Sequence, residues 1–283
     1  MKFLHLQPSV VLIFAVAAAF SSPAVADEIF PDENLRAAIK AVLKKQGKDQ
    51  IKEDDLKNVY QVTARKKGIK SLAGLEKCTN LVLLDVHENA ISDIAPLAGL
   101  KNLQSLDLSE NAVKDIKPLT ELVKLQYIQL EDNQVEDITA CKGLKKLSAL
   151  YLSRNKVKSV EPLKELPKLS SLYLGENSVT DVKPLGGLRW LANLDLQKNG
   201  VEDIAPLAGL TELRFTFLQG NKIADFSPLI EMASKDAQGD KRFAPYWRLY
   251  LDDNPIEDAK RDEQIKQLKS IGVRVNWKPK KAD

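Results

Sequence analysis

Asp85, His87 and Ser109 are the residue types of a Ser-His-Asp hydrolase and could meet on one surface of the protein. Such a site also needs hydrogen-bond donors for an oxyanion, and the sequence places neither a Gly-rich turn nor a helix N-terminus beside them. Asp85 and His87 stand two positions apart in one predicted strand, which does not suit a triad. We therefore predict that the protein is not an enzyme, with a hydrolase as a remote alternative.

The segment that carries these residues belongs to a repeat. Each repeat contains the motif LxxLxLxxN, as in "LQSLDLSEN" and "LSSLYLGEN", followed by x-[VIA]-x-D-[IVF]-x-P-L-x-x-L with small departures. In "LDL" the two leucines point to one side and the aspartate to the other, because side chains alternate along a strand. One such coil cannot bury its apolar side alone, so the period indicates a stack of coils. The interval is the same between all consecutive members of the series Asn89, Asn111, Asn133, Asn155, Asn177, Asn199 and Asn221.

On these motifs, residues 59–256 resemble leucine-rich-repeat proteins of the 22-residue type found in internalin-like bacterial proteins. The resemblance implies an α/β solenoid of horseshoe shape, with a parallel β-sheet on the concave side and short 3₁₀ segments on the convex side. It also implies that the concave surface recognises a protein.

Two polar columns of the repeat have structural explanations. The asparagine amide can both donate and accept, so it can satisfy backbone groups where the chain turns inward. The aspartate before each "IxPL" can cap the first N–H groups of a 3₁₀ turn. A calcium site is disfavoured, because calcium needs six or more converging oxygens and each coil supplies one carboxylate. The aspartate column consists of Asp93, Asp115, Asp137, Asp181, Asp203 and Asp225.

The ends of the stack need caps, because a bare terminal coil exposes core and strand edge. We predict a helical N-terminal cap over 27–58, repeats over 59–257 in about nine coils, and a helix-strand C-terminal cap over 258–283. In the N-terminal cap, a helix capped by Asp32 and stopped by Gly47 would present one apolar face. That face consists of Leu35, Ile39, Val42 and Leu43.

One interval of the asparagine series is longer than the rest. The interval from Asn221 to Asn254 is one and a half times as long as the others, and the extra residues lie in an insertion at 231–247. Insertions in solenoids map to loops, so we expect it to bulge from the convex or lateral side. A tolerated insertion without function is the simpler interpretation, although loops often carry function.

The two cysteines, Cys78 and Cys141, stand where the repeat calls for leucine, three coils apart. Strands in a sheet are about 4.8 Å apart, so these residues should be separated by roughly 14 Å. A disulfide needs Cα atoms within about 7 Å, and we predict two free, buried thiols. Neither His5 nor His87 can complete a zinc site with them, and no cofactor or metal is expected.

Outward strand positions hold the residues that the repeat leaves variable. Six of the 14 Phe and Tyr residues fall there, and exposed aromatic side chains on a rigid surface are typical of binding sites. The alternative is that tyrosine merely suits a strand and packs across it. A one-residue slip at Thr216 would turn Phe215 and Phe217 inward, but Leu213 and Leu218 stay in phase with the outward register. The predicted ligand-binding residues are Tyr127, Tyr151, Tyr173, Asp195, Phe215, Phe217, Arg248 and Tyr250.

Charge narrows the range of partners. The chain has 42 basic and 39 acidic residues and a formal charge of +3, which argues against a nucleic-acid binder. Asp85, Asp107 and Asp195 lie around the aromatic positions, so a basic or mixed-charge protein or peptide would suit this surface. A glycan or cell-envelope polymer is the alternative ligand, but it would favour tryptophan, and Trp190 lies outside the column.

Residues 1–26 differ in composition from the rest of the chain. Lys2 is followed by an apolar run at 10–20 that is too short to span a bilayer, and by the small residues Ala24 and Ala26. This pattern predicts a cleaved signal peptide over 1–26, with an uncleaved anchor as the alternative. We expect an exported monomer, periplasmic or extracellular, with no integral membrane segment after cleavage.

Overall fold

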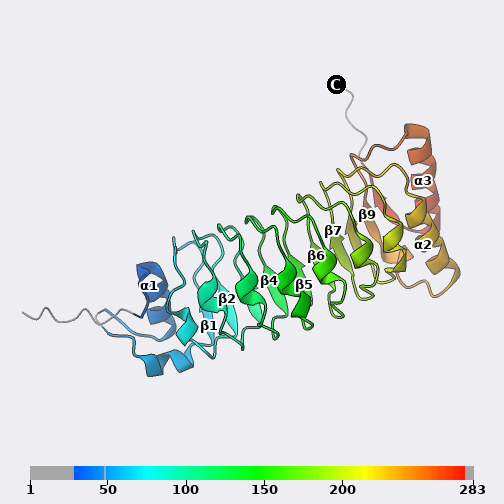
Figure 1. Ribbon diagram of the computed structural model, residues 1–283. Helices are drawn as coiled ribbons and strands as arrows, with labels where there is room; N and C mark the ends of the chain where they lie inside the picture. The colour runs from blue at the N-terminus through cyan, green and yellow to red at the C-terminus, as the bar shows by residue number, and fades with distance from the viewer. Residues whose placement is uncertain (1–28, 48, 278–283) are drawn as a thin grey trace, which may run out of the picture.

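The computed structural model describes residues 29–47 and 49–277. The predicted signal peptide lies outside them. The chain forms an open, curved solenoid in which each coil contributes one short strand and one short helix (Figure 1). All strands pair in parallel in chain order, from β1 to β10, in a single sheet. The predicted fold class, a leucine-rich-repeat solenoid with a concave parallel sheet and 3₁₀ segments opposite, is confirmed.

The strands are β1 Gln61–Thr63, β2 Leu83–Asp85, β3 Ser105–Asp107, β4 Tyr127–Gln129, β5 Ala149–Tyr151, β6 Ser171–Tyr173, β7 Asn193–Asp195, β8 Phe215–Phe217, β9 Arg248–Tyr250 and β10 Arg274–Asn276. The α-helices are α1 Glu33–Val42, α2 Ser227–Gln238 and α3 Asp258–Ile271. The 3₁₀ helices are η1 Glu53–Asn58, η2 Leu75–Lys77, η3 Ala95–Leu97, η4 Lys117–Leu119, η5 Thr139–Gly143, η6 Glu161–Leu163, η7 Lys183–Leu185, η8 Ala205–Gly209 and η9 Ala244–Tyr246.

The core is a stack of equivalent side chains. Leu84, Leu106 and Ile128 are register partners in β2, β3 and β4, and all three are fully buried. Cys78 and Cys141 are buried and unpaired, as predicted. Burial raises the pKa of each thiol to about 12, so both behave as small apolar side chains.

The asparagine column closes each coil onto the one before it. The Asn133 side-chain oxygen accepts from Val113 N–H at 2.9 Å. Its amide nitrogen donates to the carbonyls of Leu108 at 2.9 Å and Leu130 at 3.1 Å. The other asparagines of the column repeat the contact with the preceding coil. The structural role predicted for this column is confirmed.

The residue before each asparagine has a left-handed backbone. This conformation costs roughly 1–2 kcal/mol in a residue with a side chain, and the asparagine hydrogen bonds offset that cost. We call these residues the left-handed ladder, because they stand one above another along the edge of the sheet. It consists of Lys66, which precedes Lys67 at the equivalent position of the first coil, and of Glu88, Glu110, Asp132, Arg154, Glu176, Lys198, Gly220 and Asp253.

The aspartate column caps the short helices, as predicted. Each member accepts a hydrogen bond from the backbone N–H two residues later, at 2.8–3.0 Å. Five of these N–H groups begin a 3₁₀ helix, and Ser227 begins α2. Gln264 of α3 donates to the Asp225 carboxylate at 2.6 Å. That bond and the Ser227 bonds hold the pKa of Asp225 well below its usual value.

At the N-terminal end, α1 covers the first coil. Asp32 accepts from Asn34 and Leu35 N–H of the helix and from Lys70 and Ser71 N–H of the coil, so one carboxylate joins the two. Burial would raise the pKa of Asp32, but these four bonds outweigh it and lower the pKa. The predicted extent of the helix is wrong. It ends at Val42, which is exposed, because Leu43 and the left-handed Lys44 terminate it before Gly47.

The insertion differs from the expected bulging loop. Much of it extends α2, which packs against α3 at the C-terminal end (Figure 1). The buried Asp236 accepts from the N–H groups of Arg242, Phe243 and Ala244 at 2.8–3.2 Å and so shapes the return of the chain. Phe243 and Trp247 are buried with ring centroids 5.4 Å apart. The insertion therefore adds core to the last coils.

Thr216 occupies an inward position where the other coils have leucine, isoleucine or valine. The Trp247 indole N–H donates to its hydroxyl at 2.8 Å, and both residues are fully buried. The hydroxyl stabilises this packing because a buried indole N–H needs an acceptor.

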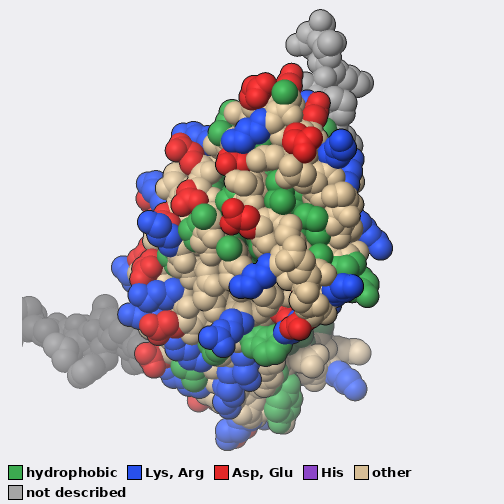
Figure 2. All heavy atoms as spheres, turned by 90° about the vertical axis from the view of Figure 1, so that its right-hand side faces the viewer, with side chains coloured by type: hydrophobic (Ala, Val, Ile, Leu, Met, Phe, Trp, Pro, Cys, Tyr) green, Lys and Arg blue, Asp and Glu red, His purple; other side chains and the backbone are tan. Residues whose placement is uncertain are grey.

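At the far end, the left-handed Gly272 terminates α3, and β10 pairs with β9. On this end, acidic and basic side chains are interspersed with hydrophobic ones (Figure 2). No helix within 29–47 and 49–277 has the length and apolar character needed to span a bilayer.

We predict that Asn133→Ala lowers the free energy of unfolding by about 2–4 kcal/mol, because Val113 N–H and two carbonyls lose their buried partner. Urea denaturation followed by circular dichroism measures the change. Lys146→Ala, at an exposed position in the next coil, is the control and should stay within about 0.5 kcal/mol. Equal effects of the two substitutions would contradict the role of the asparagine.

We predict that Thr216→Val destabilises the protein by about 1–3 kcal/mol although valine is the more apolar residue, because the Trp247 N–H is left without an acceptor. Thr216→Ser keeps the hydroxyl and should lose less. The same denaturation experiment compares them, and a Thr216→Val protein as stable as the wild type would disprove the explanation.

Candidate functional site

The candidate site is the concave surface of β4–β9. In each of these strands the middle residue is buried and the first and third face outward, so all eight predicted ligand-binding residues lie on this surface. Phe215 and Phe217 keep the outward register because Thr216 between them points inward. The eight residues differ in solvent exposure. Seven of them form two clusters, and Asp195 lies between the clusters.

The tyrosine cluster consists of Tyr127, Tyr151 and Tyr173. The rings of Tyr151 and Tyr173, on paired strands, are stacked with centroids 4.8 Å apart and an interplanar angle of 12°. Tyr127 lies diagonally from Tyr151, across from the small Ala149, with centroids 5.3 Å apart and a tilt of 46°. The rings therefore cover one another's faces and present mainly their edges and hydroxyls to the concave side.

A chain of polar side chains borders this cluster. The Tyr127 hydroxyl donates to Gln129 at 2.7 Å, and the Gln129 amide donates to Glu131 at 2.9 Å. Burial is the main cause that raises the pKa of Tyr127 to about 12, with the neighbouring Tyr151, Asp107 and Glu131 adding to it. The pKa values of Tyr151 and Tyr173 are also raised, mainly by burial. At neutral pH the hydroxyls are therefore protonated and able to donate.

The phenylalanine cluster consists of Phe215, Phe217, Arg248 and Tyr250 on β8 and β9. Phe217 and Tyr250 are stacked, with centroids 4.5 Å apart and an interplanar angle of 19°. The Arg248 guanidinium carbon lies 5.3 Å from the centre of the Phe215 ring, within the range of a cation–π contact. Arg248 is exposed and supplies a positive charge at this end of the surface.

Asp195 separates the two clusters, since its register partners are Tyr173 and Phe217. The aromatic column is therefore divided, whereas the sequence suggested a continuous one. Asp195 is only 5% exposed, and this burial raises the pKa of its carboxyl group although Gln197 donates to it twice. Gly175 makes room for this pair, because a Cβ there would lie 2.9 Å from the Asp195 carboxylate. The expectation that Asp195 offers an accessible charge is wrong.

The residues of the hypothetical triad lie close together but in another order. His87 Nδ1 is 2.8 Å from the Ser109 hydroxyl, which donates to Asp107 at 2.5 Å. Asp85 is buried and instead binds Arg65, with 2.5 Å between Arg65 Nε and the carboxylate. A carboxylate thus holds the serine proton instead of orienting the imidazole, and Ser109 is only 2% exposed. This arrangement does not activate a nucleophile.

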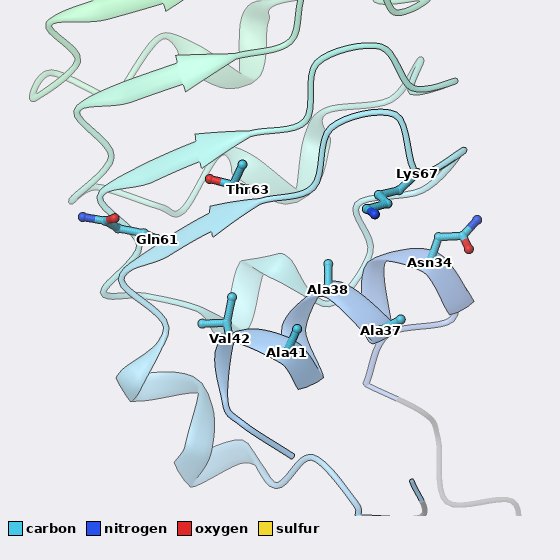
Figure 3. A pocket seen from close by; sticks show the side chains of 8 residues that line it. All are labelled: Asn34, Ala37, Ala38, Ala41, Val42, Gln61, Thr63 and Lys67. Carbon is cyan, nitrogen blue, oxygen red and sulfur yellow. The ribbon is translucent and has the colours of Figure 1, made fainter. Parts of the chain in front are cut away.

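Two features of the concave surface lie outside the predicted set of ligand-binding residues. Gln129, at an outward strand position, accepts from the Tyr127 hydroxyl, and Glu131, near the end of the same strand, accepts from Gln129. A pocket of about 560 Å³ lies between α1 and β1 (Figure 3). Its lining is Asn34, Ala37, Ala38, Ala41, Val42, Gln61, Thr63 and Lys67. The exposed Val42 and the alanines of α1 form its apolar wall, which extends the concave surface beyond the first strand.

Comparisons with known proteins agree with this geometry. A family model described as leucine-rich repeats (2 copies) matches residues 101–146 and 145–187. A search of curated proteins found no match.

Solved structures with this fold include internalin C2 from Listeria monocytogenes, which is 30% identical, with 81% of this chain and 95% of that chain covered and a TM-score of 0.68. A leucine-rich-repeat protein from Leptospira interrogans is 20% identical, with 78% of this chain and 62% of that chain covered and a TM-score of 0.65. A plant peptide hormone receptor in complex with RGF2 is 18% identical, with 65% and 30% covered and a TM-score of 0.55, so these two show the fold alone. With its regular repeats, its open parallel sheet and the likeness to internalin C2 over most of both chains, the protein belongs to the internalin-like leucine-rich-repeat family of bacteria.

Proposed function

We propose that this protein is an exported, non-catalytic binding module that holds a protein or peptide on its concave surface. The observation that carries the proposal is the pair of aromatic clusters on one sheet, the tyrosine cluster on β4–β6 and the phenylalanine cluster on β8 and β9. Their rings are half-buried, so each keeps an accessible part on a surface that the core does not need. Such aromatic groups on a preorganised surface dominate the energy of many protein interfaces.

The orientation of the rings favours a peptide over a glycan. A sugar stacks on the open face of an aromatic ring, but the faces of Tyr151 and Tyr173 are turned toward each other. The same holds for Phe217 and Tyr250. Ring edges carry positive partial charge, and the tyrosine hydroxyls donate and accept hydrogen bonds. Backbone carbonyls and carboxylates of a polypeptide suit these groups.

Charges at the two clusters favour an extended partner with both signs of charge. Glu131 adds a carboxylate beside the tyrosine cluster, and Arg248 adds a guanidinium in the phenylalanine cluster. A peptide that lies across the coils would meet the acidic side chain with its basic residues and Arg248 with an acidic one. The buried Asp195 contributes less to recognition than to the spacing of the two clusters.

Export and oligomeric state are further parts of the proposal. The charged, apolar and small-residue pattern of residues 1–26 supports secretion with cleavage before Asp27. We propose that the mature chain acts as a monomer, with the helical cap at 27–58, the repeats at 59–257 and the C-terminal cap at 258–283. The plant receptor in complex with RGF2 has the same fold, and we carry over only the class of ligand from it.

The proposed function is tested by capture of partners from extracellular and envelope fractions. We expect the wild type to retain a protein or peptide that the double variant Tyr151→Ala/Tyr173→Ala loses, because the central stack is removed. Titration of the purified partner against each variant should show a loss of at least tenfold in affinity. Circular dichroism should show that both proteins fold alike.

Trp190→Ala is the matched control for this experiment, because it removes an aromatic ring that is 62% exposed and lies outside the concave surface. It should bind like the wild type. A partner that both variants retain would move the site away from the tyrosine cluster. A ligand that survives exhaustive protease treatment and still binds would favour the glycan alternative.

The tyrosine hydroxyls also make a pH dependence testable. Tyr127 has a pKa of about 12 in the folded protein against about 10 for an unperturbed tyrosine, so the unfolded chain ionises first as the pH rises. Its contribution to stability is complete below pH 10 and is lost between about pH 10 and pH 12. We therefore expect Tyr127→Phe to make stability fall less steeply over this range. Urea denaturation at several pH values measures the slopes, and equal slopes for both proteins would contradict the raised pKa.

A further inference from the structure

Three metal-ligating side chains meet at the edge of the sheet beside β2 and β3. His87 Nε2 lies 3.6 Å from a Glu88 oxygen and 3.7 Å from a Glu110 oxygen. One ligand atom from each residue falls within 4.8 Å of the others. All three side chains are partly exposed, so an ion can reach them from solvent. This cluster lies outside both aromatic clusters.

The charges of the left-handed ladder single out this position. Lys66 pairs with Glu88 at 2.6 Å, Arg154 with Asp132 at 2.5 Å, and Lys198 with Glu176 at 3.4 Å. Glu110 stands between Glu88 and Asp132, and in the described part of the chain no Lys or Arg lies within 4.0 Å of its carboxylate. Among the described residues its basic partner within ion-pair distance is His87, and Lys66 acts on it only from farther away. An extra positive charge at this point would relieve the repulsion between adjacent carboxylates.

Hydrogen bonds also fix which tautomer a neutral imidazole adopts at this position. Ser109 lies 2.5 Å from Asp107, and since a carboxylate only accepts, the serine hydroxyl donates to it. The serine oxygen then accepts from His87 Nδ1–H at 2.8 Å. In the neutral ring this leaves the lone pair on Nε2, directed at Glu88 and Glu110. A histidine that binds a metal through one ring nitrogen usually donates the N–H of the other nitrogen to an oxygen acceptor. Here that acceptor is the Ser109 hydroxyl, which is itself bound to the Asp107 carboxylate.

We propose that His87, Glu88 and Glu110 bind a divalent first-row transition cation of the Zn²⁺ type. Zinc bonds of about 2.0–2.1 Å in a tetrahedron place neighbouring ligand atoms roughly 3.4 Å apart, close to the 3.6 and 3.7 Å between His87 Nε2 and the two carboxylates. An imidazole ligand favours zinc and its neighbours over Ca²⁺ and Mg²⁺, which prefer oxygen ligands alone. The fourth position is left for water or for a group of a bound partner. Binding of the cation requires that the Lys66–Glu88 ion pair breaks. This pair is exposed, so breaking it costs little free energy.

Titration calorimetry with Zn²⁺ tests the proposal on the purified full chain without a histidine tag. We expect one ion per chain, and a loss of at least tenfold in affinity for each of His87→Gln and Glu110→Gln. Lys66→Ala should bind Zn²⁺ more tightly than the wild type, because it removes the competing ammonium group. A purely structural role of the cluster would not produce that gain. Zn²⁺ should also raise the melting temperature of the wild type more than that of either ligand variant.

Glu176→Gln is the matched control, since Glu176 belongs to the same ladder but is paired with Lys198 and has no histidine beside it. It should bind Zn²⁺ like the wild type, as should His5→Gln. The buried thiols of Cys78 and Cys141 cannot compete for the ion. Absence of binding up to about 1 mM Zn²⁺, equal binding by His87→Gln, or a preference for Ca²⁺ over Zn²⁺ would each overturn the proposal.

Discussion

The hydrogen bonds of the repeated asparagine are the contacts on which the rest of the solenoid depends. Each asparagine amide satisfies a backbone N–H of the preceding coil and carbonyls of both coils, in a place where the chain turns inward and no strand or helix can do so. These hydrogen bonds also offset the conformational free energy that the left-handed backbone of the preceding residue costs. Because this geometry recurs from coil to coil, consecutive strands pair without a slip, and the outward positions of one coil lie beside those of the next.

This regularity explains the character of the concave surface. Tyr151 and Tyr173 occupy equivalent positions on paired strands, so their rings stack face to face and leave their edges accessible. The same alignment produces the left-handed ladder, in which neighbouring charges pair along the edge of the sheet. The proposed recognition by ring edges and hydroxyls, and the proposed cation site where two carboxylates adjoin a histidine, would both follow from the placement of variable residues in strict columns.

The ends of the stack are stabilised by different contacts, because a terminal coil has no neighbouring coil to cover its core and bind its backbone groups. At one end a single carboxylate, Asp32, joins α1 to the first coil through four backbone bonds. At the other end the insertion extends α2, which packs against α3, while Asp236 binds the backbone of the returning chain and Trp247 is buried against Thr216. Thr216 stands in a position where most coils have leucine, and it accepts a hydrogen bond from the indole of Trp247 in the insertion.

The fold class, the register of the strands, the roles of the asparagine and aspartate columns and the burial of both cysteines could all be predicted from the residues alone. This was possible because every coil repeats one set of local contacts, and a fixed period admits one way of stacking. How individual side chains meet could be known only once the coils were packed in three dimensions. The diagonal contact of Tyr127 with Tyr151, the burial of Asp195, the order His87–Ser109–Asp107 and the helical path of the insertion depend on side-chain rotamers and on packing between coils. The contacts of Tyr127 with Tyr151 and of His87 with Ser109 join residues about one period apart, and the spacing alone says which residues are neighbours but not which atoms touch.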